Sequence, residues 1–242
     1  MDLKKTKLMT ILSVMFVATL MMSSTSQAAD AAPGEGFYAG LFVGYGTGIV
    51  QADVTLLDTN QTFETDSGGL GLSGIQGGGW LGWGMKTADD LYFGAEMSFA
   101  GSDEKIELTT NQNLGADNNG TITSASAKRN WAGGGAIRVG YYVNSETLFA
   151  LSGGVAVSQF DVDIGSSNDS YYAGGPQVGA SITTQLSKID PNLGLRMEFV
   201  YTDYLTADLN GLNGAGTGSG HNNNSTITGH DTAGRIGVTY RF

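Results

Sequence analysis

The chain has 242 residues, a formal net charge of −11, 38 glycines and no cysteine. Charged residues make up 14% of it, whereas roughly 25% is usual for soluble proteins. The acidic balance argues against nucleic acid as a partner, and the missing cysteines exclude a disulfide scaffold and a thiolate zinc site. Aromatic residues are spread along the whole chain, which argues against disorder. We therefore expect one folded domain.

The first 28 residues have the pattern of an export signal. Lys4, Lys5 and Lys7 precede an apolar stretch over residues 8–22, and Ser26 and Ala28 place small residues at a signal-peptidase site. A membrane anchor is the alternative, but the stretch is short and no basic flank follows it. We predict a cleaved signal peptide over residues 1–28 and a short periplasmic lead-in over 29–35.

Beyond the leader, no apolar run approaches the ~20 residues of a membrane helix. The dominant pattern from Gly36 onward is instead an alternation of apolar and small or polar residues, which is typical of β-strands. In the first run, Phe37, Ala39, Leu41, Val43 and Tyr45 alternate with Tyr38, Gly40, Phe42, Gly44 and Gly46. Similar runs cover residues 75–85, 91–99, 130–141, 149–158, 177–186, 193–202 and 234–242.

The connections between these eight runs alternate in length. Residues 86–90, 144–147 and 187–192 form short connections, whereas 51–69, 101–127, 161–170 and 205–229 are long and polar. Short connections at one end and long ones at the other are typical of outer-membrane barrels. We predict an all-β fold: a closed eight-stranded antiparallel transmembrane β-barrel over residues 36–242, with short periplasmic turns and long extracellular loops.

The same alternation would also fit a soluble β-sandwich with its apolar face inside. A wetted soluble face carries many charges, but here the second face is mostly glycine, alanine, serine and glutamine. Aromatic residues are expected at both ends of the apolar face, as in membrane barrels. They are Phe37, Trp83, Phe93, Tyr141, Phe149 and Tyr240 at the turn end, and Phe99, Trp131, Phe160 and Tyr201 at the loop end. We predict that the apolar face contacts lipid.

The last strand, residues 234–242, alternates and ends on an aromatic residue, and residues 195–204, 37–40 and 94–96 carry related patterns. In these features the chain resembles the OmpA-like and opacity-type small outer-membrane barrels. The resemblance implies the outer membrane of a Gram-negative bacterium, with outer-membrane lipid and lipopolysaccharide as surroundings. It also implies that Tyr240 and Phe242 form a signal for the barrel-assembly machinery. No peptidoglycan-binding domain follows Phe242 in this sequence, so tethering to the cell wall is not expected.

Five ionisable residues fall on the inward face at comparable depth. They are Glu96, Arg138, Arg196, Glu198 and Arg235. We expect Glu96 to pair with Arg138, and Glu198 with Arg196 or Arg235, because the planar guanidinium suits a carboxylate. The network either plugs a narrow lumen or forms the charged constriction of a small pore. Eight strands leave room only for side chains, which favours the plug.

The predicted role is structural: the barrel contributes to envelope integrity and presents its loops for contact with host or surface ligands. Two alternatives remain, a small porin-like diffusion channel and a lipid A-modifying enzyme. For the enzyme, His221, Ser225, His230 and Asp231 in the fourth loop could supply a nucleophile and a base. Glycine and asparagine surround them without fixed geometry, so we predict no catalytic residues, no cofactor and no metal site.

Overall fold

The computed structural model describes residues 32–56, 61–64, 70–109, 124–164, 167–208 and 226–242, and every described element is a β-strand. The strands are β1 (Gly36–Leu56), β2 (Gln61–Glu64), β3 (Leu70–Lys86), β4 (Leu91–Thr109), β5 (Ser124–Asn144), β6 (Thr147–Ile164), β7 (Ser167–Gln185), β8 (Leu193–Asp208) and β9 (Thr226–Arg241). No helix long and apolar enough to cross a membrane occurs in these residues.

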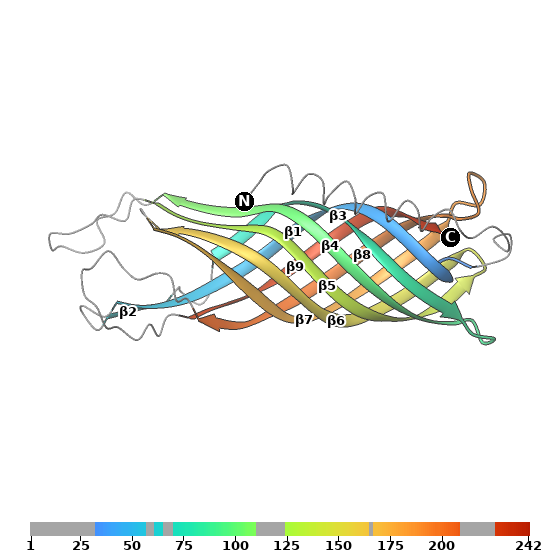
Figure 1. Cartoon of the computed structure of the whole chain (residues 1–242), viewed down its shortest axis with the longest axis horizontal. Coiled ribbons are helices and arrows are strands. Elements are labelled where there is room, and N and C mark those ends of the chain that lie inside the picture. Colours follow the sequence, from blue (N-terminus) through green and yellow to red (C-terminus); the bar gives the residue numbers. More distant parts are fainter. Residues whose placement is uncertain (1–31, 57–60, 65–69, 110–123, 165–166, 209–225) are drawn as a thin grey trace, which may run out of the picture.

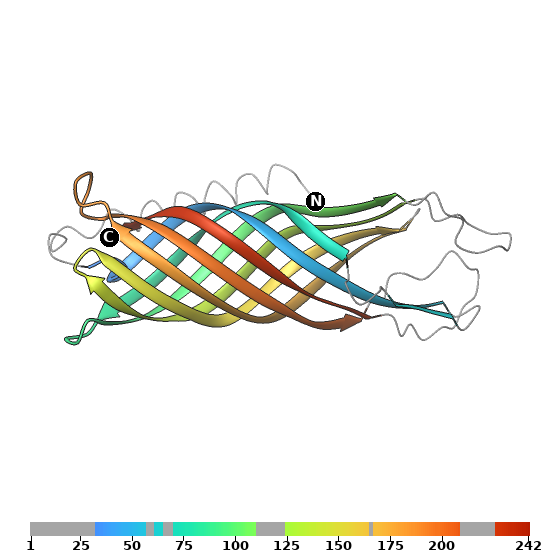
Figure 2. The ribbon, with the colours of Figure 1, turned by 180° about the vertical axis from the view of Figure 1, so that it is seen from behind.

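Eight of the strands form a closed antiparallel wall. Each strand pairs with its neighbour in the order β1-β3-β4-β5-β6-β7-β8-β9, and β9 pairs again with β1. The closing seam runs from Tyr38, opposite Arg241, to Asp53, opposite Thr226. The ninth strand, β2, pairs with β1 beyond the wall. Figures 1 and 2 show a continuous wall from both sides, which confirms the predicted eight-stranded closed barrel.

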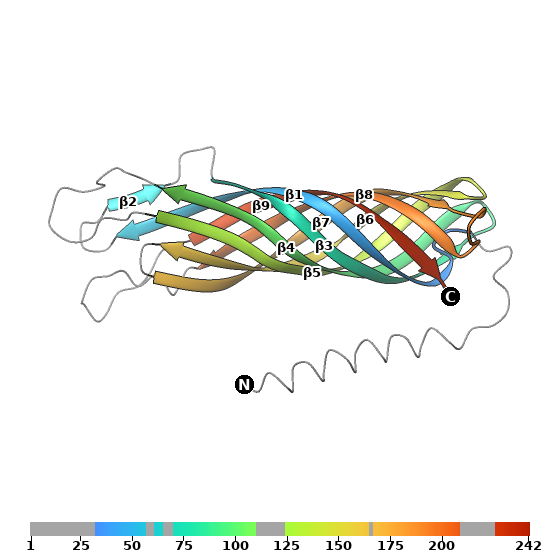
Figure 3. The same ribbon diagram turned by 90° about the horizontal axis from the view of Figure 1, so that it is seen from above.

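One end of the barrel carries the short connections that the sequence predicts. The strand pairs β3–β4, β5–β6 and β7–β8 are joined there by residues 87–90, 145–146 and 186–192. Asp90 has a φ of 58°, a left-handed conformation that aspartate tolerates in tight turns, and it pairs with Lys86 at 2.8 Å. The end of β9 also lies here, as Figure 3 shows. We call this the turn end, and the opposite one the loop end.

At the loop end, the strands extend further than predicted. β4 continues to Thr109, and β9 already begins at Thr226, so residues assigned to long loops belong to the wall. The prediction was wrong because it followed the apolar alternation, which stops where outward side chains become polar. Backbone pairing needs no apolar side chain and continues past that point.

The predicted orientation of the two faces is confirmed. Leu41 and Phe199 point outward with exposed fractions of 70% and 54%, whereas Arg138 and Arg196 point inward and are 2% and 0% exposed. Further outward positions are apolar as well, among them Leu81, Met97, Ile137 and Ile236. Hydrocarbon around the wall favours this arrangement, because apolar side chains then cover the hydrogen-bonded backbone.

One aromatic residue was assigned to the wrong face. Phe160 is buried inside the barrel, where it stacks on Tyr171 at 5.4 Å and packs edge-on against Tyr204 at 5.4 Å between ring centroids. It lies an even number of residues from Ala150 and Ser158 on β6, and these two side chains also point inward. Alternation itself therefore places Phe160 in the lumen, and its aromatic character was misleading.

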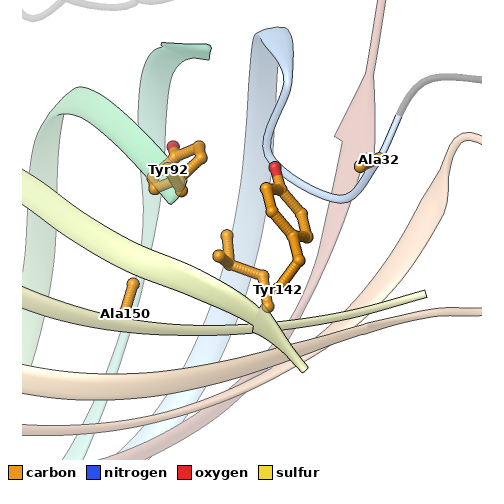
Figure 4. Close-up of a cluster of buried hydrophobic side chains, with 5 residues drawn as sticks. Ala32, Tyr92, Tyr142 and Ala150 are labelled. Atoms are coloured by element: carbon orange, nitrogen blue, oxygen red, sulfur yellow. The ribbon is translucent and has the colours of Figure 1, made fainter. Parts of the chain in front are cut away.

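Large side chains fill the lumen where the neighbouring strand has glycine in register. A Cβ on Gly82 would lie 2.4 Å from the ring of Tyr38, so the glycine makes room for that ring. At the turn end, Tyr92, Tyr142, Leu148 and Ala150 form a buried cluster with Ala32, as Figure 4 shows. The residues just before β1 are held against this cluster by two hydrogen bonds. Tyr142 donates to the carbonyl oxygen of Pro33 at 2.9 Å, and Arg241 donates to the carbonyl oxygen of Ala32 at 3.0 Å.

If the wall faces lipid, the loss of stability caused by an added charge should depend strongly on the position of that charge. Leu41→Arg should lower the free energy of unfolding by ~2–4 kcal/mol, the cost of a basic residue near the bilayer midplane. Equilibrium unfolding from lipid vesicles measures it. Ile189→Arg is the matched control, because Ile189 is 76% exposed but lies in the turn after β7. Equal losses for the two variants would contradict the assignment of the faces.

Candidate functional site: the charged lumen

The structure brings the five predicted lumen residues together nearer the turn end. We call Glu96 (β4), Arg138 (β5), Arg196 and Glu198 (β8) and Arg235 (β9) the turn-side layer. Glu96 is its centre: its Oε2 lies 3.3 Å from Nη1 of Arg138 and 2.5 Å from Nη1 of Arg196. A second contact joins Oε1 to Nη2 of Arg196 at 2.9 Å. Such bidentate pairs are the strongest arginine–carboxylate contacts.

Glu198 also contacts two arginines in this layer. Nη2 of Arg196 donates to Oε1 of Glu198, and Nη1 of Arg235 lies 3.6 Å from Oε2. Arg196 therefore contacts both carboxylates, an arrangement that the predicted separate pairs did not include. β4 and β8 lie four places apart in the eight-stranded ring, so the Arg196–Glu96 contact is a cross-lumen ion pair between opposite walls.

Neutral side chains complete the turn-side layer. Tyr38 donates to Oε2 of Glu96 at 2.8 Å and accepts from Arg138 at 3.0 Å, and Arg138 also donates to Ser181 at 2.8 Å. Above them, Arg196 lies 4.3 Å from the centroid of the Trp80 ring, a favourable cation–π geometry. The alternation pattern already put Tyr38 and Trp80 inward, and that signal could have added them to the predicted network.

A second charged layer lies nearer the loop end, and the sequence analysis missed it. We call Glu104 (β4), Arg129 (β5) and Asp231 (β9) the loop-side layer. Arg129 donates to Oε1 of Glu104 and to Oδ2 of Asp231, both at 2.5 Å. Its Nη1 lies 3.4 Å from the hydroxyl of Tyr204, which is 2.7 Å from that of Ser158. β5 and β9 are also four places apart, so Arg129–Asp231 is a second cross-lumen ion pair.

The two layers have opposite charge excesses. The turn-side layer holds three arginines and two glutamates, and the loop-side layer holds one arginine and two carboxylates. Glu104 lies eight residues after Glu96 on β4, and Asp231 lies four residues before Arg235 on β9, so both are displaced toward the loop end. At ~3.3 Å per residue and a ~40° tilt, the layers are ~10–20 Å apart along the barrel axis. Taken together, the charges of the two layers balance.

Of the residues considered for catalysis, the structure describes His230 and Asp231, and these two do not face each other. His230 and Asp231 lie within β9, not in a loop as predicted. They are consecutive on a strand and so point to opposite faces: His230 packs against Tyr201, with 5.8 Å between ring centroids, and Asp231 binds Arg129 in the lumen. His221 and Ser225 lie outside the described residues. The two described residues therefore cannot work as a paired base and orienting acid.

A cluster of three aromatic side chains marks the loop-side limit of the apolar outer surface. Trp131 stacks on Phe99 and meets Tyr172 edge-on, with 5.7 and 6.1 Å between ring centroids. Beyond it the wall is polar: Lys128 pairs with Asp103 at 3.1 Å, and hydrogen bonds from Ser170 and Asn130 lower the pKa of Asp161. This polar margin lies past the part of the wall that lipid would cover.

Comparison with known proteins supports the fold. No family model and no curated protein matches the sequence. Among solved structures, the chain is similar to the outer membrane protein OprG from Pseudomonas aeruginosa, at 15% identity, a TM-score of 0.53, and coverage of 88% of this chain and 99% of that one. It is also similar to the outer membrane protease OmpT from Escherichia coli (9% identity, TM-score 0.47, covering 91% and 99%) and to Neisserial surface protein A (13%, 0.43, covering 84% and 97%).

At these identities the likeness concerns the fold alone, and the OprG comparison carries it. The closed wall, the apolar outer face and the polar lumen are those of the small outer-membrane β-barrels. The resemblance drawn from the strand patterns is confirmed at this level.

The geometry of Glu96 predicts a large effect of its removal. Glu96→Ala should lower the free energy of unfolding by ~3–5 kcal/mol, because Arg138 and Arg196 would lose their shared carboxylate while buried. When samples are heated to graded temperatures before electrophoresis, the compact band should convert to the unfolded band at a lower temperature than in the parent protein. Asp89→Ala, at an exposed turn residue, is the control. A compact band that persists to the parent temperature would contradict the role of Glu96.

The loop-side layer yields a second prediction. Arg129→Met should destabilise the barrel by ~3–5 kcal/mol, because two buried carboxylates would be left without their cation. Adding Glu104→Gln to Arg129→Met should recover part of the loss, since one of the two like charges is removed. Denaturant unfolding of the single and double variants measures both effects. A double variant less stable than Arg129→Met would show that the carboxylates do not repel each other.

Proposed function

We propose that the protein is a closed structural barrel of the outer membrane of a Gram-negative bacterium, which contributes to envelope integrity and presents its loops at the cell surface. The observation that carries the proposal is the double bracing of the lumen by Arg196–Glu96 and Arg129–Asp231. Each contact ties opposite walls together where a pore would need open space. A braced, filled lumen suits a structural role better than solute passage.

The export route and assembly are part of the same proposal. Residues 1–28 act as a cleaved signal peptide, and 29–35 remain as the periplasmic lead-in before the barrel domain of 36–242. Tyr240 and Phe242 act as the signal for the barrel-assembly machinery: Tyr240 lies near the end of β9 and Phe242 directly follows the strand, with 5.4 Å between their ring centroids. In the membrane, lipid and lipopolysaccharide surround the wall.

A small porin-like channel is the second candidate, and the charged lumen favours it. Four arginines and four carboxylates in the two layers would screen passing ions if the side chains moved apart. We assign no enzymatic activity, because His230 and Asp231 face opposite sides of β9. The activity of the protease OmpT is not carried over to this chain.

Planar-bilayer conductance distinguishes the two candidates. The refolded barrel should show no stepwise conductance, because both layers close the lumen. The double variant Glu96→Ala/Arg129→Met, which loses a residue from each layer, should show brief steps if it stays folded. Frequent, regular steps from the parent protein would favour the channel. Greater detergent sensitivity of cells lacking the protein, reversed by the parent gene, tests the envelope role.

A further inference from the structure

The lipid-facing wall contains an open groove, although a narrow barrel has a convex outer surface. The groove has a volume of about 730 Å³ and crosses strands from β6 to β3. Its sides are apolar, formed mainly by Phe149, Ile182, Met197, Phe199, Ile236 and Tyr45. One row of these side chains lies in direct register, because Phe149 is opposite Ile182, Ile182 opposite Met197, and Met197 opposite Ile236.

The hollow results from small residues in the adjacent row. There, Ala180 is opposite Phe199, Phe199 is opposite Gly234, and Gly234 is opposite Tyr45. Small and large side chains thus alternate around the wall in this row. The two small residues, Ala180 and Gly234, form the floor of the groove. A Cβ on Gly234 would meet nothing within 4 Å, so the floor there is open to the surroundings.

The position of the groove restricts what can occupy it. Phe199 and Gly234 are the chain neighbours of Glu198 and Arg235, so the groove lies at the depth of the turn-side layer, inside the apolar surface. In a bilayer, only hydrocarbon reaches this depth. The groove is open on its outer side, so an elongated chain can lie in it from the bilayer. A second barrel would instead need a broad contact of about 1,000 Å² or more.

We propose that this groove binds one acyl chain of a membrane lipid. The proposal rests on the outer-membrane location proposed above. The chain lies against Gly234 and Ala180, between the larger side chains of both rows. Glu198 and Arg235 also line the groove, so the bound chain covers the wall directly behind the Glu198–Arg235 pair. It thereby packs against the outer side of a strand region that small residues leave uncovered.

The test uses two glycines that face lipid in the same way. Gly153 on β6 is also exposed, and a Cβ there would also meet nothing within 4 Å, but it does not line the groove. The full mature barrel and the variants Gly234→Leu and Gly153→Leu are refolded in micelles doped with phosphatidylethanolamine. Native mass spectrometry then measures how many lipid molecules each barrel retains.

The parent protein and Gly153→Leu should each retain one phospholipid, and Gly234→Leu should reduce its occupancy at least tenfold. Ala180→Leu, which fills the other end of the floor, should do the same and provides a second variant if Gly234→Leu fails to fold. No retained lipid in the parent, equal retention in Gly234→Leu, or a dimer lost in that variant would each overturn the proposal. Gel migration and vesicle insertion, measured separately, show whether the membrane location itself has failed.

Discussion

The ion pair between Arg196 and Glu96 joins two opposite walls across the lumen, and the rest of the interior is arranged around it. Both residues are buried, so each charge needs its partner to offset the loss of hydration. Tyr38 on β1 and Arg138 on β5 extend the contact to two further strands, and Glu198 adds a second carboxylate from β8 itself. A barrel whose outer face is apolar must place its polar groups inside, and here the charged groups meet across the lumen.

The two charged layers divide the lumen into sections with different chemistry. Arginine is in excess in the turn-side layer and carboxylate in the loop-side layer, and the stacked rings of Phe42 and Trp80, 5.0 Å apart between centroids, pack against Arg235 and Arg196. Ala100 and Ala233 lie between the layers on β4 and β9, and both are buried. Small and aromatic residues thus separate the charged layers, and the arrangement braces the wall at two depths.

Much of this fold could be predicted from the sequence, because strand periodicity is a local property. Leu41 outward and Arg196 inward follow directly from alternation, as do the short turns. The sequence offered Glu198 as a partner of Arg196, but Glu96 could not be predicted as its second partner, because it is a hundred residues away and faces Arg196 only once the barrel closes. The loop-side layer was missed for another reason: around Glu104 and Arg129 both faces of the wall are polar, so alternation no longer separates lumen from surface.

A double-mutant cycle between Arg196 and Glu96 tests the central claim most directly, with Arg196→Met, Glu96→Leu and the combined variant unfolded from the same lipid vesicles. The cross-lumen ion pair predicts that the combined variant is more stable than the sum of the single losses implies, by a coupling of up to ~3 kcal/mol. Additive losses within ~0.5 kcal/mol would contradict it, because the two walls would then be held together without this contact.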